Sequence, residues 1–97
     1  MPTYIVLINW TQQGLEKIKD GPARLDAARK AAQRAGGDIK AFYLTMGRFD
    51  AVLIGEAPTE EVFATLLLAT GAQGNVRTET LHAITEDEFR KLIAGLP

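Results

Sequence analysis

The sequence predicts an α+β fold in which one antiparallel sheet carries crossover helices on a single face. Four extended runs rich in β-branched and aromatic residues alternate with stretches of helical period. Glycine or proline marks most of the boundaries between them. The predicted order is β-α-β-β-α-β followed by a C-terminal helix, which is the ferredoxin-like pattern.

The first strand and crossover occupy the N-terminal third of the chain. Thr3–Trp10 is predicted as a strand because β-branched and aromatic residues dominate it. The next stretch places apolar residues near helical period, at Leu15, Ile18, Leu25, Ala28, Ala32 and Ala35. Proline suits the first turn of a helix and not its interior. We therefore expect a short helix over 11–19, a new helix with Pro22 near its first position, and a stop at Gly36-Gly37.

A hairpin and a second crossover helix follow. Asp38–Met46 and Phe49–Glu56 are predicted as strands joined around Gly47-Arg48. Ala57-Pro58-Thr59 opens a helix that carries two glutamates in its first turn, where the helix dipole favours negative charge. We expect Gly71 to end this helix.

The last strand and helix have clear sequence signals. Asn75–Ile84 alternates polar and apolar side chains, as a strand does when one of its faces is buried. Thr85 and Glu88 form a capping box, with threonine as the N-cap and glutamate at the third helical position. The box predicts a helix that runs to about Ala94.

Composition narrows the range of functions. The 97 residues correspond to one domain, 1–97, and the formal net charge of −1 gives no basic excess for nucleic acid or anionic lipid. There is no cysteine and only one histidine, so we expect neither a disulfide, nor a metal, nor a cofactor. The first apolar run is too short to cross a bilayer and has no signal-peptide flanks, so a soluble, cytoplasmic protein is expected.

The strands are apolar on both faces. Tyr4, Val6, Ile8 and Trp10 oppose Ile5 and Leu7. In the hairpin, alternation sets Phe42, Leu44 and Met46 against Ile39, Ala41 and Tyr43, and Val52 and Ile54 against Phe49, Ala51 and Leu53. Crossover helices cover only one face, and each large side chain left exposed on the other forfeits roughly 1.5–3 kcal/mol. The C-terminal helix at Phe89, Leu92 and Ile93 is one candidate cover, but a homodimer or larger oligomer is the simpler expectation.

Several short stretches carry a family resemblance in combination. They are Gly47-Arg48-Phe49-Asp50, Glu56-Ala57-Pro58, Gly74-Asn75-Val76-Arg77-Thr78-Glu79-Thr80-Leu81 and Glu86-Asp87-Glu88-Phe89, with Arg24-Leu25 after Gly21-Pro22. The chain resembles the GYD-domain proteins, which are small and mostly uncharacterised. The resemblance implies a ferredoxin-like fold of the dimeric α/β-barrel kind, in which two sheets meet, and it implies no established reaction. Phe49 stands where the family has its eponymous tyrosine, so no role that needs this phenol is expected.

Four side chains are candidates for a ligand site: Tyr43, Arg48, Asp50 and His82. His82 is either a proton-transfer group in a pocket between sheets or a strand-end histidine that is solvated or bonded to backbone. Asp50 either orients a ligand or acts as a base, or else pairs with Arg48 or bonds the hairpin backbone. The Tyr43 hydroxyl either reaches such a pocket or belongs to a core or interface.

Two function classes remain open. The first is an oligomeric, non-catalytic module that binds a small, partly apolar molecule or serves as an accessory subunit. The alternative is a cofactor-independent oxygenase or isomerase that uses a pocket between sheets, with His82 or Asp50 moving a proton. RNA binding fits worst, because RNA-recognition motifs expose aromatic residues on their central strands and carry basic surfaces. Arg77 and Glu79 share a face and are expected to form an ion pair, within the strand or across a subunit boundary.

Overall fold

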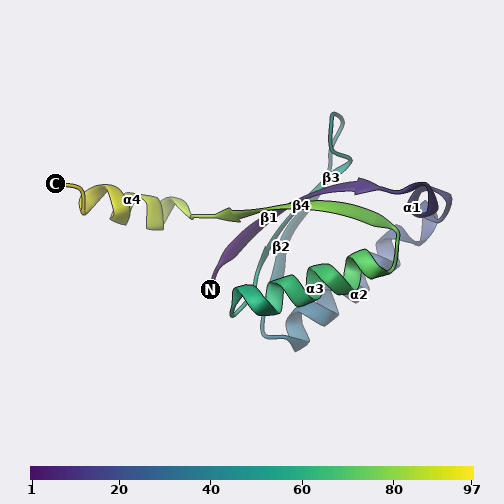
Figure 1. Ribbon diagram of the computed structural model, residues 1–97, viewed down its shortest axis with the longest axis horizontal. Coiled ribbons are helices and arrows are strands. Elements are labelled where there is room, and N and C mark those ends of the chain that lie inside the picture. The colour runs from purple at the N-terminus through teal and green to yellow at the C-terminus, as the bar shows by residue number, and fades with distance from the viewer.

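The computed structural model describes all 97 residues and confirms the predicted α+β fold (Figure 1). Its sheet has the strand order β2-β3-β1-β4, and every neighbouring pair is antiparallel. The central strands are β1 (Thr3–Trp10) and β3 (Ala51–Glu56), and the edges are β2 (Asp38–Leu44) and β4 (Val76–Ala83). Both crossover helices lie on the same side of this sheet, which is the ferredoxin-like arrangement.

The first crossover forms as the glycine and proline positions predict. A short α1 (Gln12–Glu16) begins at Thr11, whose side chain accepts a hydrogen bond from the Gly14 N–H, and a 3-10 turn, η1 (Ile18–Asp20), follows. The long helix α2 (Gly21–Arg34) then starts with proline in its first turn. It ends before Gly36, which has a φ of 86° and takes the left-handed conformation that terminates many helices.

The second crossover helix, α3 (Glu60–Ala72), begins at Thr59, whose side chain accepts from the Val62 N–H. The helix continues through Gly71, so the stop predicted there lies too early. Gly71 fits within the helical backbone, and the left-handed glycine that precedes β4 is instead Gly74, with a φ of 80°.

The loop of the hairpin is longer than predicted. Strand β2 ends at Leu44 and strand β3 begins at Ala51, which leaves residues 45–50 outside the sheet. Thr45 closes this loop internally, because its side chain donates to the Phe49 carbonyl at 2.7 Å and its N–H donates to the Asp50 carbonyl at 2.9 Å. These loop contacts replace the ladder pairs that longer strands would have made.

A β-bulge changes the predicted faces of β2. The pairing with β3 shifts register between Ile39 and Ala41, so that Ile39 lies opposite Gly55 and Phe42 opposite Leu53. Ile39 therefore faces the helices together with Phe42, and the prediction that it shares a face with Ala41 and Tyr43 is wrong. The extra residue at the bulge, Lys40, breaks the strict alternation on which that prediction relied.

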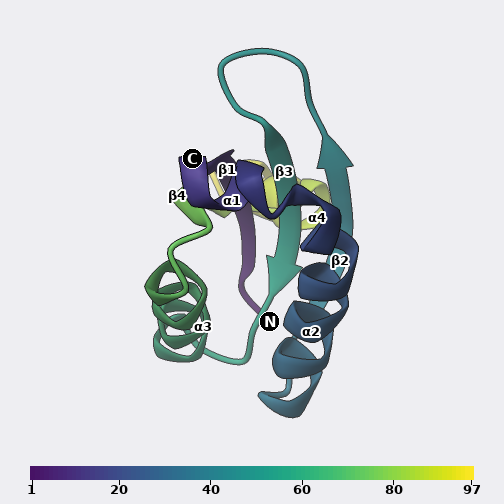
Figure 2. The ribbon, with the colours of Figure 1, turned by 90° about the vertical axis from the view of Figure 1, so that its right-hand side faces the viewer.

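The core is small and lies between the sheet and the helices. Its buried cluster takes alternate residues of β1 and adds residues from β3, the loop before α3, and α3 itself: Tyr4, Val6, Ile8, Ala51, Ala57 and Phe63. The other face of the sheet has no helix over it. Figure 2 looks from the helix side and shows α2 and α3 set apart, with β1 and β3 running between them.

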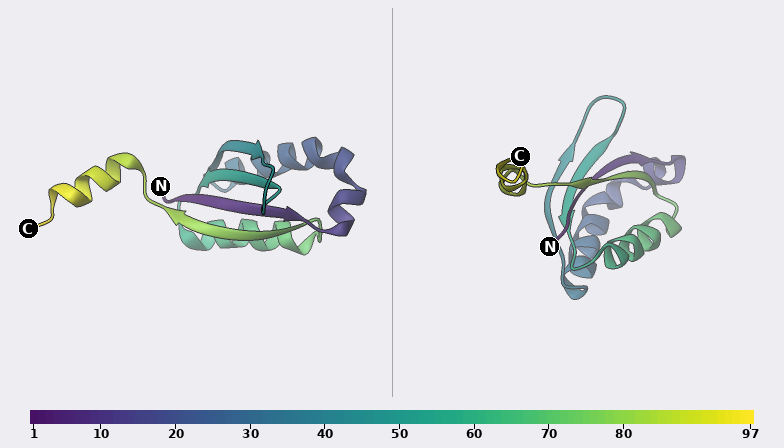
Figure 3. Two further views of the ribbon diagram at one scale, coloured as in Figure 1. Left: turned by 90° about the horizontal axis from the view of Figure 1, so that it is seen from above. Right: turned by 60° about the vertical axis from the view of Figure 1, so that its left-hand side comes forward.

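The C-terminal helix α4 (Glu86–Ala94) projects away from the rest of the molecule (Figures 1 and 3). It forms as the capping box predicts, with Thr85 accepting from the Glu88 N–H and its hydroxyl bonded to the Glu88 carboxylate at 3.0 Å. It does not cover the open side of the sheet. Its apolar residues Phe89, Leu92 and Ile93 are all exposed, as is Leu96 just beyond it. None of the helices is both long enough and apolar enough to span a membrane.

Candidate functional site

A cavity of about 650 Å³ lies between α2, α3 and the sheet. The apolar side chains that line it come from the sheet and from both helices, among them Val6, Ile8, Trp10, Phe42, Leu53, Leu66 and Leu67. Small-molecule sites in proteins typically have roughly 300–1,000 Å³ and predominantly apolar walls. Interiors of folded proteins otherwise contain few voids larger than one water molecule. The volume and the apolar lining of this cavity fall within the range of small-molecule sites.

The sequence of α2 explains why the cavity exists. Beyond Arg24 and Leu25, the side of α2 that faces it carries small side chains where a core helix normally carries leucine or isoleucine: Ala27, Ala28, Ala31 and Ala32. The opposing α3 presents larger apolar groups, and the two helices stay apart over the sheet. Alanine is too short to fill the space between the helices, so the hollow follows from these residues.

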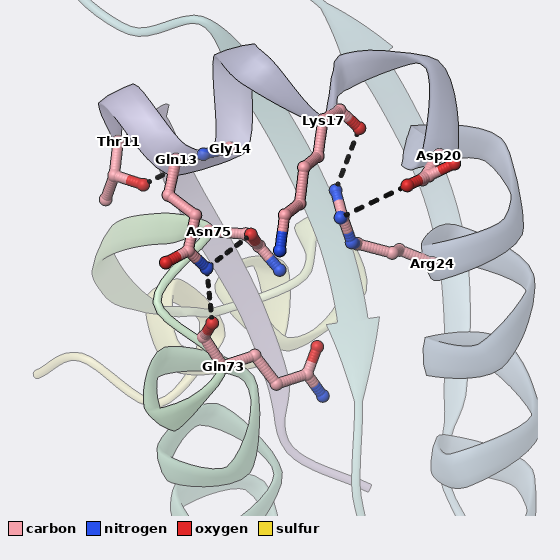
Figure 4. A network of polar contacts seen from close by, with 8 residues as sticks. All are labelled: Thr11, Gln13, Gly14, Lys17, Asp20, Arg24, Gln73 and Asn75. Carbon is pink, nitrogen blue, oxygen red and sulfur yellow. Dashed lines mark hydrogen bonds and ion pairs between the residues drawn. The ribbon is translucent and has the colours of Figure 1, made fainter.

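A polar network borders one end of the cavity (Figure 4). Gln13 links α1 to the turn before β4, since its Nε2 donates to the Gln73 carbonyl at 2.9 Å and to Asn75 Oδ1 at 3.0 Å. Thr11 adds a hydrogen bond to the Gly74 carbonyl at 2.6 Å. Gly14 lies so close to the Asn75 carbonyl that a Cβ at this position would overlap it. These contacts hold the turn before β4 in place at the edge of the cavity.

Three polar residues line the cavity at this end, and we call this end, together with the adjacent Lys17, the mouth: Arg24, Gln73 and Asn75. Figure 4 shows the four side chains near one another, coming from the end of α1, from α2, from the end of α3 and from the turn before β4. Arg24 donates to the Lys17 carbonyl at 3.2 Å and lies 3.7 Å from the Asp20 carboxylate. Asn75 is a buried polar residue, with 8% of its surface exposed. None of these four residues is among the site residues predicted from sequence, in which Asn75 begins the last predicted strand and Arg24 and Asn75 belong to the family resemblance.

The opposite side of the sheet presents an apolar surface without a helix, which we call the open face. Strand register places its residues in two rows across the four strands: Ala41, Ile54, Ile5, Leu81 in one, and Tyr43, Val52, Leu7, Glu79 in the other. Tyr43 is 60% exposed and Leu81 is 48% exposed, although both are apolar or aromatic. No ion pair forms within the chain between Arg77 and Glu79, which share this face.

Asp50, a candidate ligand or proton-transfer residue, is engaged by backbone. Its Oδ2 accepts from the Trp10 N–H at 3.0 Å, and its own N–H donates to the Ile8 carbonyl at 2.9 Å. Arg48 forms no ion pair with it and instead lies over the Phe49 ring, 5.6 Å from the ring centre. The Asp50 carboxylate therefore contacts neither of the structural partners expected for it, Arg48 or the hairpin backbone, and its partner is the backbone of β1.

His82 lies at the other end of the sheet, on the helix side. Its ring stacks on Tyr4 with 5.1 Å between centroids, and Tyr4 in turn stacks on Phe63 at 4.1 Å. The Nδ1 of His82 lies 3.5 Å from Glu60 Oε1, so the first turn of α3 supplies a carboxylate that β4 itself lacks. The sequence pattern of β4 does not indicate this pair, because it carries no information about which helix lies beside the strand.

Tyr4 is the most unusual group in this cluster. Its hydroxyl is buried and has no hydrogen-bond partner. Burial raises the pKa of the Tyr4 phenol, and the nearby carboxylates of Glu60 and Glu61 raise it further. The phenol is thus held in its neutral form.

The structure separates the four predicted site residues. Tyr43 lies on the open face, whereas His82 faces the helices. Asp50 contacts the Trp10 end of β1 and His82 pairs with Tyr4 near the other end, six residues away, a span of about 20 Å along a strand. No arrangement within one chain brings these residues into a common pocket.

A four-stranded antiparallel sheet with two crossover helices on one side defines this chain as a ferredoxin-like α+β protein. It belongs to the GYD-domain family, whose profile matches residues 4–93. It is 34% identical over 85 residues to a protein of Thermus thermophilus described as "Glutamine synthetase and cystathionine beta-lyase binding protein", covering 87% of this chain and 90% of that one.

Two solved structures share the fold. FFRP-DM1 superposes with a TM-score of 0.62 at 15% identity, over 87% of this chain and all of that one. The protein TTHA0845 of Thermus thermophilus gives 0.53 at 23% identity, over 88% and 95%. At these identities the similarity concerns the fold alone.

Proposed function

We propose that this protein is a cytoplasmic, self-associating binding module without catalytic activity, which serves as an accessory subunit of other enzymes. The observation that carries the proposal is the open face, where apolar residues from all four strands lie uncovered in two rows. Large contiguous apolar surfaces of this kind mark sites of protein association.

The partner for the open face is a second copy of the chain. An exposed apolar sheet face can pack on the same face of a second copy under two-fold symmetry, which is the commonest symmetry of homo-oligomers. Glu79 and Arg77 are unpaired at the edge of this face, so each is free to pair with the opposite charge on the second copy. The exposed apolar side of α4 adds a further contact surface at the end of β4.

The accessory role draws on the related protein from Thermus thermophilus, whose name states that it binds glutamine synthetase and cystathionine beta-lyase. A module that binds enzymes needs an accessible surface and no catalytic centre of its own. The enzymatic alternative, an oxygenase or isomerase, requires His82 or Asp50 in an enclosed pocket. The Asp50 carboxylate is engaged by Trp10, and His82 is half exposed beside Glu60, so the geometry favours binding.

A second role, the binding of a small, partly apolar molecule, is favoured by the cavity under the helices. This location differs from the predicted space between two sheets. It lies on the opposite side of the sheet from the open face, so one chain can hold a ligand and a second copy at the same time.

Sedimentation velocity tests self-association. We expect a dimer or larger species at micromolar concentration, and we expect Leu7→Arg to weaken it at least tenfold, because the charge falls in the middle of the open face. Leu68→Arg is the matched control, since Leu68 is an exposed leucine on α3 and should leave association unchanged. A stable, folded monomer at micromolar concentration would overturn the proposal.

Direct binding of purified enzymes tests the accessory role. The immobilised chain is exposed to glutamine synthetase and, separately, to cystathionine beta-lyase from the same organism, and saturable binding of at least one is expected. Serum albumin serves as the control for nonspecific adhesion to apolar surface. Binding of neither enzyme above that control contradicts the accessory role and leaves the self-association result unaffected.

A further inference from the structure

We propose that the cavity binds a small amphipathic anion, with its apolar body between α2 and α3 and a single carboxylate at the mouth. This inference rests on the proposed small-molecule role and names the class of ligand. It follows from the unpartnered groups at the mouth, the charges beside them, and the contrasting charges at the far end of the cavity.

Asn75 supplies the most specific observation. It is more than nine-tenths buried and lines the cavity. Its Oδ1 accepts from Gln13 Nε2, which fixes the carboxamide so that the amide nitrogen points away from Gln13. This Nδ2 makes no hydrogen bond within the protein and keeps some solvent exposure at the mouth, so it is available to a ligand. A ligand oxygen in the mouth would satisfy it.

Positive charge lies beside this donor. Arg24 lines the cavity, and its contact with the Asp20 carboxylate is long, at 3.7 Å, so guanidinium N–H groups remain for a ligand. Lys17 forms no ion pair, and Figure 4 shows its side chain directed toward the mouth. Two cations against one carboxylate leave the mouth positive. Donors and positive charge together select a carboxylate over a hydroxyl or an amine.

The rest of the cavity selects an apolar body with no second charge. Alanines of α2 and large apolar residues of α3 and the sheet form its walls. At the far end, Asp38 and Glu56 line the cavity, and both contact Lys40, at 3.7 and 3.4 Å. Two carboxylates that share one ammonium group disfavour a further anion there. A ligand with one acidic head and an aliphatic tail matches this distribution.

Tryptophan fluorescence can report whether the cavity is occupied. Trp10 is the single tryptophan and lies in the cavity wall, so its fluorescence responds to a ligand there. We expect decanoate, titrated below its micellar concentration, to produce a saturable change. The neutral analogue decanol should bind at least tenfold more weakly. Decyltrimethylammonium, which has the same tail and a positive head, should not bind measurably.

Two variants test the head group. Asn75→Asp keeps the oxygen that Gln13 needs but removes the N–H donor and adds negative charge, and Arg24→Gln removes the guanidinium. Each should weaken decanoate binding at least tenfold and change decanol binding less than twofold. Arg34→Gln, at the exposed end of α2, is the matched control and should change neither.

A third variant tests the location. Ala28→Leu narrows the cavity and should weaken binding of both decanoate and decanol at least tenfold without loss of folding, whereas Ala64→Leu, on the exposed side of α3, should not. Equal affinities for decanoate and decanol would overturn the inference that the ligand has an anionic head group. They would leave the proposed small-molecule role unaffected. No saturable response to either would overturn both. Binding that Ala28→Leu does not weaken would place the site elsewhere and overturn the inference.

Discussion

The carboxylate of Asp50 accepts a hydrogen bond from the backbone N–H of Trp10, at 3.0 Å, across forty residues of chain. This contact fastens the base of the hairpin loop to the end of β1, together with the bond from the Asp50 N–H to the Ile8 carbonyl. It explains why a carboxylate stands at the start of an apolar strand. Without Asp50, the Trp10 N–H would lose its acceptor at a partly buried position.

Asp50→Ala is expected to lower the free energy of unfolding by about 2 kcal/mol, since the lost hydrogen bond is charge-assisted. Asp50→Asn retains a neutral acceptor and should cost about half as much. Urea denaturation followed by circular dichroism measures both. Asp26→Ala, on the exposed side of α2, is the control and should change stability by less than about 0.5 kcal/mol. Equal stability of Asp50→Ala and wild type would show that the contact contributes nothing.

Gly14→Ala should be strongly destabilising, by about 2 kcal/mol or more, because the new Cβ would overlap the Asn75 carbonyl and force α1 away from the turn before β4. Gly71→Ala is the matched substitution. No atom lies within 4 Å of the Cβ it adds, and Gly71 lies inside α3, where alanine suits the helical backbone better than glycine. It should be neutral or stabilise by about 0.4–1 kcal/mol. Thermal unfolding compares the two, and similar melting temperatures would contradict the close approach.

Tyr4→Phe is expected to raise the melting temperature slightly at neutral pH, because it removes a buried hydroxyl that has no partner while keeping the stacking on Phe63. Differential scanning calorimetry measures the change. Phe63→Ala is the contrasting variant, since it removes the stacked ring and leaves a cavity in the core, and it should lower stability by about 3–5 kcal/mol. A clear loss of stability in Tyr4→Phe would show that the hydroxyl is satisfied.

The raised pKa of Tyr4 also predicts how the free energy of unfolding changes at alkaline pH. The folded state holds the Tyr4 proton more tightly than the unfolded chain, in which the pKa has its ordinary value of 10.0. The contribution of Tyr4 to stability is therefore complete below pH 10 and is lost as the pH rises through the raised pKa of the folded state. Chemical denaturation across this range should show a decline that Tyr4→Phe makes shallower and that Tyr43→Phe, on the open face, leaves in place.

Deletion of residues 85–97 should leave the fold of the sheet and crossover helices intact, because α4 packs on neither. At concentrations where the chain is monomeric, the free energy of unfolding should change by less than about 0.5 kcal/mol. Association should weaken, as measured by sedimentation. The double variant Phe89→Glu, Leu92→Glu keeps the helix and should weaken association to a similar degree, and unchanged association in both would exclude α4 from the interface.

Local signals account for the elements that were predicted correctly. The N-cap at Thr85, the helix start at Pro22 and the stop at Gly36 each depend on the conformation of a few neighbouring residues. The bulge at Lys40 has no comparable signal, because it depends on how β2 pairs with β3. For the same reason, Ile39 was assigned to the wrong face.

The candidate site was less predictable than the fold. Asn75 becomes notable only because Gln13, sixty-two residues away in the chain, occupies its oxygen and leaves its nitrogen free. The His82–Glu60 contact likewise joins a strand to a helix that precedes it. Pattern analysis within one element detects neither.

By itself, the sequence determined the order of strands and helices, the two apolar faces of the sheet and the membership of the GYD-domain family, because hydrophobic period, capping and family motifs are encoded locally. Only the tertiary structure decided which face the helices cover, where a cavity remains and which polar groups lie at its mouth. Those properties depend on distances between elements, and the volumes of side chains on opposing elements set these distances.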